Sequence, residues 1–183
     1  MVIPTLTTPR LILRPFVHDD LDELAVIHAE ESFWWYPLRR GMTTVQSAEF
    51  LTRTIERYGS DGFGVEALID RGSGVMIGWA GLAVPHFLPE ILPAVEVGWR
   101  LAGAFRRRGL ATEAGAAAVD WGFIHGGLER LVSIFEPENV ASGKVMEHLG
   151  FTPFLTTTGM LHGKDVVVTE LSIETWRERR TNG

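Results

Sequence analysis

The chain contains no cysteine, has fewer basic than acidic residues, and lacks a long hydrophobic run. The absence of cysteine excludes disulfides, thiolate nucleophiles and cysteine-based zinc or iron–sulfur centres. With a formal net charge of −6, we do not expect the broad basic face of a general nucleic-acid binder. The longest apolar run, residues 74–85, is too short to cross a bilayer, and the first ten residues lack a signal-peptide layout. We therefore expect a soluble, cytoplasmic protein whose partners include neither nucleic acid nor membrane.

The remaining composition is typical of one globular domain. Hydrophobic residues make up 45% of the chain and charged residues 22%, which is too apolar for a disordered protein. A length of 183 residues is enough to bury one good core. No internal repeat, low-complexity tract or linker interrupts the sequence, so we expect a single domain over residues 1–183.

Hydrophobic patterning and capping residues predict an α/β (α+β) chain. Helices are expected where Asp19, the Thr43–Gln46 capping box and Asn139 precede helical spacing, with Gly150 as a stop. The charged stretch 174–180 is assigned no element. The expected helices are 18–31, 44–58, 109–124 and 139–150, and the expected strands are 10–16, 62–70, 74–84, 93–102, 129–135, 151–157 and 164–173. This order predicts a mixed sheet with helices on both faces and leaves several such folds open.

The run FRRRGLATEA, residues 105–114, stands out in an acidic protein. Gly109 and its successors fall in the first turn of a predicted helix, where amides lack intrahelical partners and the helix dipole attracts anions. The three preceding arginines supply charge that suits a diphosphate. The run matches neither a Walker loop nor a Rossmann fingerprint. A solvated basic turn is the alternative reading.

Five segments in the same order resemble the GNAT superfamily of acyl-CoA-dependent N-acyltransferases, most closely its ribosomal-protein-alanine (RimJ/RimL-type) branch. They are TPRLILRPF (8–16), MIGWAGL (76–82), VEVGWRL (95–101), RRRGLATEA (106–114) and ENVASGKVMEHLGF (138–151). The resemblance implies a largely antiparallel seven-stranded sheet with a splayed pair of central strands. It also implies transfer of an acetyl group from acetyl-CoA to a primary amine by direct attack in a ternary complex.

The same resemblance assigns a coenzyme site. The pantetheine arm is expected along the backbone of Val97–Leu101, and the pyrophosphate on the amides of residues 107–112. Many relatives carry glycine where Arg107 stands, which leaves the path of this loop open. The implied coenzyme residues are Gly98, Trp99, Arg100, Leu101, Arg106, Arg107, Arg108, Gly109, Leu110, Ala111, Thr112, Asn139 and Ser142. For Asn139 and Ser142, a helix N-cap and an ordinary first-turn serine are the alternatives.

Catalytic roles follow from the position of Glu96 in an otherwise apolar strand. Glu96 is the leading candidate base, and a solvent-facing carboxylate is the alternative reading. The Val97 amide is expected to stabilise the oxyanion. Many members of the superfamily that this sequence resembles protonate the leaving thiolate with a tyrosine. Because Tyr36 and Tyr58 both lie far upstream, the resemblance leaves that role to Ser142 or a water. Glu113 is expected to orient helix and loop.

The acceptor side is the least defined part of the sequence. Four consecutive aromatics, residues 33–36, are too many for one core face, so Trp35 and Tyr36 are assigned to the acceptor site, a groove or a dimer contact. The alternative is an irregular loop that tucks two rings into the core. His86 is a second candidate base, with simple solvation as the alternative. No metal-ligand spacing is present, so no metal is expected.

The acceptor is expected to be a protein N-terminal amine or a small-molecule amine, and a homodimer is possible. A non-catalytic acyl-CoA sensor on the same fold stays open as a second function.

Overall fold

A single sheet crosses the whole molecule in the computed structural model, which describes residues 3–159 and 163–181. Its strands run in the order β1-β2-β3-β4-β5-β6-β8-β7, and every neighbouring pair is antiparallel except β5 and β6. The strands are β1 (Leu6–Thr7), β2 (Leu11–Arg14), β3 (Val65–Asp70), β4 (Met76–Ala83), β5 (Glu96–Leu101), β6 (Arg130–Phe135), β7 (Thr152–Gly159) and β8 (Lys164–Ser172). The expected mixed, largely antiparallel sheet is confirmed.

The expected strand number was wrong by one. Seven strands were predicted, and the described residues form eight, because β1 pairs with the end of β2 over only two residues. Two residues are too few to show the alternation by which a strand is predicted from sequence. This short strand forms the edge of the sheet next to β2 and packs Leu6 against the core cluster that includes α3.

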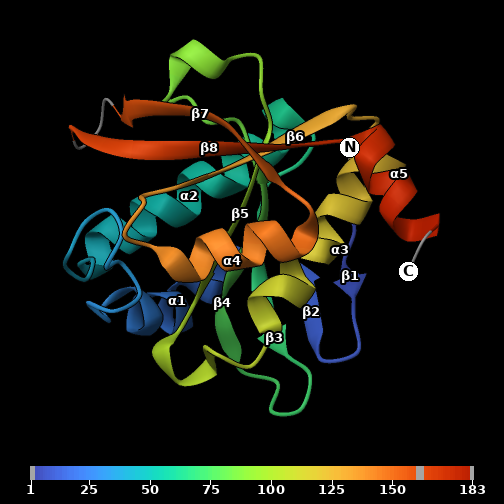
Figure 1. The fold of residues 1–183 in the computed structure, drawn as a ribbon. Coiled ribbons are helices and arrows are strands. Elements are labelled where there is room, and N and C mark those ends of the chain that lie inside the picture. The colour runs from blue at the N-terminus through green and yellow to red at the C-terminus, as the bar shows by residue number, and fades with distance from the viewer. Residues whose placement is uncertain (1–2, 160–162, 182–183) are drawn as a thin grey trace.

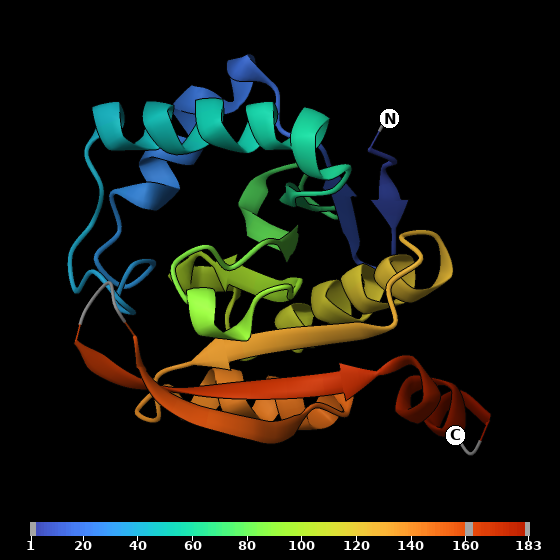
Figure 2. The ribbon, with the colours of Figure 1, turned by 90° about the horizontal axis from the view of Figure 1, so that it is seen from above.

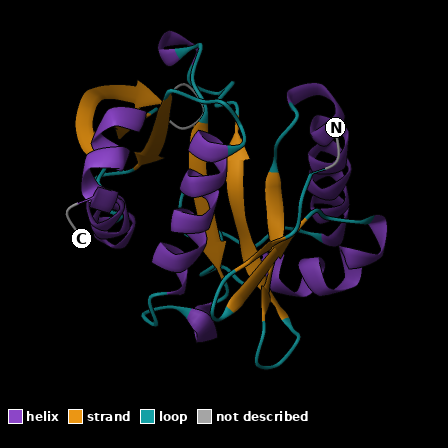
Figure 3. Ribbon diagram, turned by 90° about the vertical axis from the view of Figure 1, so that its right-hand side faces the viewer, coloured by secondary structure: helices purple, strands orange, loops and turns teal. Residues whose placement is uncertain are grey.

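Helices cover both faces of the sheet (Figures 1 and 3). They are α1 (Leu21–His28), α2 (Thr44–Asp61), α3 (Leu110–Ile124), α4 (Val140–Leu149) and α5 (Ile173–Thr181). One core cluster packs α1 and α2 against the sheet, and two others pack α3 and α4 against its opposite face. In the view from above, α2 lies on the opposite side of the molecule from β7 and β8 (Figure 2). No helix in the described part of the chain is long and apolar enough to span a membrane.

The helix ends follow local sequence signals in most cases. The Thr43 side chain accepts from the Gln46 amide and Gln46 Oε1 accepts from the Thr43 amide, which confirms the capping box. Gly150 ends α4 at φ 95°, in the left-handed region.

Two end assignments were corrected by tertiary contacts. Asp19 is not the cap of α1: a single 3-10 turn, His18–Asp20, precedes that helix, and Asp20 accepts the Val17 amide while pairing with Arg14. The charged C-terminal stretch, assigned no element, forms α5 because Trp176 packs on Phe123 and donates to Asp120 at 2.9 Å. Packing decides these helices, since their own sequence signals are weak.

Candidate active site

The parallel strands β5 and β6 pair at one point and then separate. Glu96 is registered with Val132, whose amide donates to the Val95 carbonyl at 2.9 Å. The buried Ser133 hydroxyl donates to the Val97 carbonyl at 2.8 Å. No further ladder pair joins the two strands, so the sheet has the expected splayed central pair.

Strand geometry decides which main-chain groups face the gap between β5 and β6. Alternate residues of a strand direct their amide and carbonyl to the same neighbour. The Val97 amide therefore points to β6 where the strands are still paired at Val132, and the Val97 carbonyl already accepts Ser133. The next residue with this orientation is Trp99. The Trp99 amide and carbonyl are therefore the first β5 main-chain groups that lie beyond the paired region.

The side chains of β5 divide between the two faces of the sheet. Val97 and Leu101 are buried against α3, so Glu96 and Arg100 point to the opposite face, which carries α1 and α2. Arg100 Nη1 donates to the carbonyls of Phe33 (2.8 Å) and Tyr36 (2.5 Å). Arg100 thus fixes the loop between α1 and α2 against the strand that carries Glu96.

Burial changes the acid–base properties of this pair. It raises the pKa of Glu96 to about 8, although the Arg100 charge opposes the rise. Burial also lowers the pKa of Arg100 to about 10, with repulsion from Arg106 adding to the effect and attraction to Glu96 opposing it. A carboxyl group with a pKa near neutrality is a suitable acceptor for an amine proton.

The arginines before α3 have three different environments. Arg106 is engaged by the protein, since its Nε donates to the Leu101 carbonyl (2.9 Å) and its Nη2 to the Ser32 carbonyl (2.6 Å). Arg107 is exposed with φ 59°, in the left-handed region that glycine adopts most easily. Arg108 lies over the Phe105 ring at 5.5 Å. The loop path at Arg107 is thus the one a glycine would take.

A row of free amides precedes and opens α3. No hydrogen bond is found within the described chain for the amides of residues 107–112. Gly109 has φ 76°, and the nearest atom to a Cβ placed there is Arg10 Nη2 at 3.5 Å, so the space beside the loop is open. Six successive donors at a helix N-terminus suit a phosphate-sized anion.

Glu113 holds this loop to the N-terminal segment. Its carboxylate accepts from Thr8 Oγ1 (2.6 Å), the Arg10 amide (2.8 Å) and Arg10 Nε (2.6 Å), and these bonds together lower the pKa of Glu113 despite the opposing effect of burial. The orienting role expected for Glu113 is confirmed.

Asn139 and Ser142 lie at the start of α4. Asn139 Oδ1 accepts from the Ser142 amide at 3.3 Å, so Asn139 is the N-cap of this helix. The Asn139 Nδ2 group and the partly buried Ser142 hydroxyl make no hydrogen bond to the described chain. Both groups can therefore serve a ligand without disturbing the cap.

The aromatic run 33–36 divides between core and surface. Phe33 and Trp34 are buried, whereas Trp35 is 45% exposed. Trp35 and Tyr36 flank the Arg39 guanidinium at 5.0 and 4.5 Å from their ring centroids. Two rings thus enter the core, as the alternative reading supposed, and two form a surface cluster.

Sequence reasoning missed the partners of this surface cluster. Arg39 Nη2 lies 3.0 Å from a carboxylate oxygen of both Glu136 and Glu138, and Lys164 also approaches Glu136 at 3.5 Å. Arg39 and Glu136 are 97 residues apart, and no local pattern signals such a pairing. His86 lies exposed on the loop before the 3-10 turn Pro89–Ile91, and its ring bonds to no described residue.

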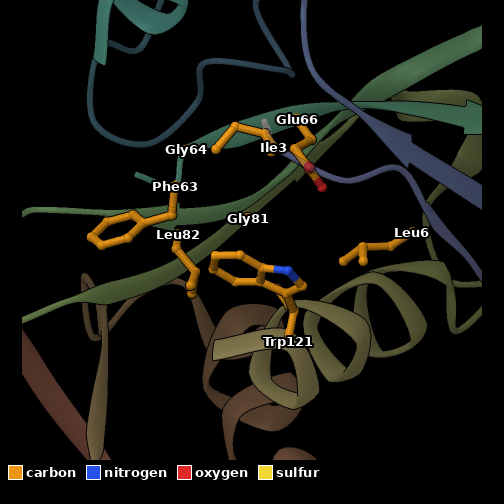
Figure 4. A pocket seen from close by; sticks show the side chains of 9 residues that line it. Ile3, Leu6, Phe63, Gly64, Glu66, Gly81, Leu82 and Trp121 are labelled. Atoms are coloured by element: carbon orange, nitrogen blue, oxygen red, sulfur yellow. The ribbon is translucent and has the colours of Figure 1, made fainter. Parts of the chain in front are cut away.

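A small cavity lies on the face of the sheet that packs against α3 (Figure 4). Its volume of about 20 Å³ is enough for one water. Glu66, 4% exposed, reaches into it, and burial raises its pKa to about 8. The cavity is lined by Ile3, Leu6, Phe63, Gly64, Glu66, Gly81, Leu82, Ala118 and Trp121. Across residues 3–159 and 163–181, no group of His, Asp or Glu side chains is arranged to hold a metal ion.

The sheet thus opens between two parallel strands, and amides that are free within the described chain lie before and within the first turn of α3. A family model described as an acetyltransferase (GNAT) domain matches residues 10–152. The chain therefore belongs to the GNAT acetyltransferase family.

Individual relatives agree with this assignment. The N-acetyltransferase YoaA of Bacillus subtilis (strain 168) is 25% identical over 151 residues, which is 82% of this chain and 84% of YoaA. A GnaT-family acetyltransferase structure from Bordetella pertussis has a TM-score of 0.80 and 26% identity, covering 92% of this chain and 99% of its own. The ribosomal L7/L12 acetyltransferase RimL in complex with coenzyme A shares the fold at TM-score 0.77 and 15% identity, covering 96% of this chain and 99% of its own. Relatives inside and outside the RimL group thus share the fold.

Proposed function

We propose that this protein transfers an acetyl group from acetyl-CoA to a primary amine by direct attack in a ternary complex. The observation that carries the proposal is the pairing of two features: the open edge of β5 after Val97 and the six free amides at residues 107–112. A ligand with an extended arm and a diphosphate would use both features, the strand edge for the arm and the amides for the diphosphate. Coenzyme A has that shape, and the RimL relative was solved with it.

The residues present fit acetyl-CoA as co-substrate. The amides from Arg107 to Thr112 would hold its pyrophosphate, with the exposed Arg107 adding positive charge. The backbone of residues 98–101 would pair with the pantetheine arm, and Asn139 Nδ2 would contact it from α4. Arg106 supports the site through Leu101 and Ser32 rather than through the phosphates. Acetyl-CoA supplies an acyl group activated as a thioester.

Glu96 acts as the base in this proposal. An α-amino group has an ordinary pKa of about 7.7–8.0, whereas a lysine amine has one of about 10.4. The Glu96 pKa of about 8 matches the α-amine and similar weakly basic amines. The neutral nitrogen adds to the acyl carbon, so that negative charge develops on the carbonyl oxygen. The carbon–sulfur bond then breaks as the carbonyl re-forms. Glu96 receives the nitrogen's proton, and Ser142 or a water protonates the departing thiolate.

The oxyanion contact is reassigned from Val97 to Trp99. The Val97 amide faces the paired end of β6, whereas the Trp99 amide lies beyond it on the open edge. Trp35, Tyr36 and His86 remain the proposed acceptor-side residues, with Trp35 and Tyr36 held around Arg39. Resemblance to the RimJ/RimL branch supports a protein N-terminal amine as acceptor.

The substitution Gly109→Glu tests the coenzyme site. It places bulk and negative charge beside the free amides, and we expect acetyl-CoA binding measured by calorimetry to fall below detection while the circular dichroism spectrum is unchanged. Gly127→Glu is the matched control, because Gly127 also has a positive φ (65°) and open space around it. Unchanged affinity in Gly109→Glu would show that the loop is misassigned.

The release of CoA thiol with a panel of amines separates the enzyme from the alternative sensor. Turnover on an N-terminal peptide or a small amine supports the transferase. Binding of acetyl-CoA without turnover on any amine would instead support a non-catalytic acyl-CoA module.

A further inference from the structure

Ser133 lies where the ladder between β5 and β6 ends. Ser133 is only 1% exposed, and its Oγ donates to the Val97 carbonyl at 2.8 Å. This bond follows directly after the single strand pair, Glu96 with Val132. A side chain, rather than another main-chain amide, thus makes the last contact between the two strands.

A regular parallel ladder would continue differently. After the Val132 amide donates to the Val95 carbonyl, the next donor from β6 is the Ile134 amide, and its acceptor is the Val97 carbonyl. Here the Val97 carbonyl accepts the Ser133 hydroxyl, and no ladder pair forms at Ile134. The Ser133 hydroxyl supplies the hydrogen bond that the buried Val97 carbonyl requires. The strands therefore need not form the next main-chain bond, from the Ile134 amide.

The other edge of β6 stays firmly attached. Thr169, on β8, donates its Oγ1 to the Ser133 carbonyl at 2.9 Å, and the β6–β8 ladder continues to the pair Phe135–Val167. The main-chain ladder thus holds Ser133 to β8, whereas its side chain bonds to β5. β6 therefore stays paired with β8 after its pairing with β5 has ended.

We infer that Ser133 is a positioning residue that ends the β5–β6 ladder and so sets the inner end of the coenzyme slot. This inference rests on the proposed function for the identity of the ligand. Without the hydroxyl, the buried Val97 carbonyl is left to pair with the Ile134 amide. The ladder then lengthens by one pair, which closes about 7 Å of the slot at about 3.3 Å per residue.

The test compares Ser133→Ala, Ser133→Thr and Thr169→Val. In Ser133→Ala we expect the KM for acetyl-CoA to rise about tenfold or more, because one buried hydrogen bond is lost and the slot becomes shorter. The KM for the amine should stay nearly unchanged. Hydrogen exchange at the Ile134 amide, measured without ligand, should slow about tenfold. Ser133→Thr keeps the hydroxyl and should restore both values. Thr169→Val removes a buried hydroxyl that also bonds to Ser133, but it leaves the β6–β8 ladder and the Ser133–Val97 bond in place, so it should change neither value.

The outcomes separate this inference from the proposed function. Normal acetyl-CoA affinity together with unchanged Ile134 exchange in Ser133→Ala would overturn the inference. An equal loss in Thr169→Val would also overturn it, because the effect would then belong to general packing. A wild-type protein that binds no acetyl-CoA would refute the proposed function, whereas slower Ile134 exchange in Ser133→Ala would still support the role of Ser133 in ending the ladder.

Discussion

Two regions of the sheet carry a carboxyl group with a similarly raised pKa, the half-buried Glu96 and the buried Glu66, in different surroundings. Glu96, on β5, and Glu66, on β3, both have a pKa raised to about 8, and burial is the main cause in each case. Glu96 faces the α1–α2 side beside Arg100 and next to the point where β5 and β6 part. Glu66 faces the α3 side and reaches into a cavity large enough for one water.

The difference shows that acidity alone does not identify a base. A raised pKa is common at functional sites, but any desolvated carboxyl acquires one. What distinguishes Glu96 is access to a strand edge with unpaired main-chain groups and a neighbouring cation that favours its ionised form. Glu66 has neither, since its neighbours in the cavity are almost all apolar.

The largest expected effect separates the two carboxyls by turnover. Glu96→Gln should lower kcat/KM by about 10²–10⁴-fold, the usual contribution of a general base, without changing acetyl-CoA affinity. Glu66→Gln, the matched control, should retain wild-type turnover. Both are measured by CoA-thiol release with the best amine of the panel. Equal activity losses in the two variants would remove the functional distinction between them.

A second prediction concerns the pH dependence of the rate. Because Glu96 must be ionised to accept a proton, kcat should rise with pH through an apparent pKa near 8. This inflection should disappear in Glu96→Gln and persist in Glu66→Gln. An inflection retained in Glu96→Gln would assign the titration to another group.

The smallest effect is on stability and concerns Glu66. Its folded-state pKa of about 8 lies above the ordinary value of 4.5, so the folded state binds more protons than the unfolded state between these values. Stability from this group is therefore fully present below about pH 4.5 and is lost as the pH rises to about 8. Glu66→Gln removes the loss.

The measurement is the difference in Tm between Glu66→Gln and wild type at two pH values. A pKa shift from 4.5 to about 8 corresponds to about 3.5 kcal/mol of stability between pH 5 and pH 8. We therefore expect this difference in Tm to grow by about 7–14 °C in favour of the variant over that interval, at about 2–4 °C per kcal/mol for a chain of this size. Comparing the variant with wild type at each pH removes the contribution of His28, whose pKa burial lowers to about 4. A constant difference would mean that Glu66 does not titrate on folding.

Local sequence signals correctly predicted the helix ends that depend on neighbouring residues. The Thr43–Gln46 capping box, the Asn139 cap and the Gly150 stop all lie where expected, because each depends on residues within four positions of one another. The short strand β1 escaped prediction because two residues show no alternation. Helix α5 escaped prediction because the partner of Trp176, Asp120, lies 56 residues away.

The candidate site was predictable to a similar extent. The sequence placed Gly109 at the start of a helix, and this alone implies free amides. It did not reveal that Arg106 binds carbonyls of the protein itself. The side-chain direction of each arginine depends on a neighbouring loop, which no local pattern describes.

By itself, the sequence determined the class of fold and the family of this protein, since hydrophobic periodicity, caps and five ordered segments are short-range features. The tertiary structure alone decided which groups face the opening in the sheet. Only there do Val97 and Ser133, 36 residues apart, meet and end the β5–β6 ladder. Only there does Glu96 differ from Glu66, because burial, neighbouring charge and access are properties of the packed chain.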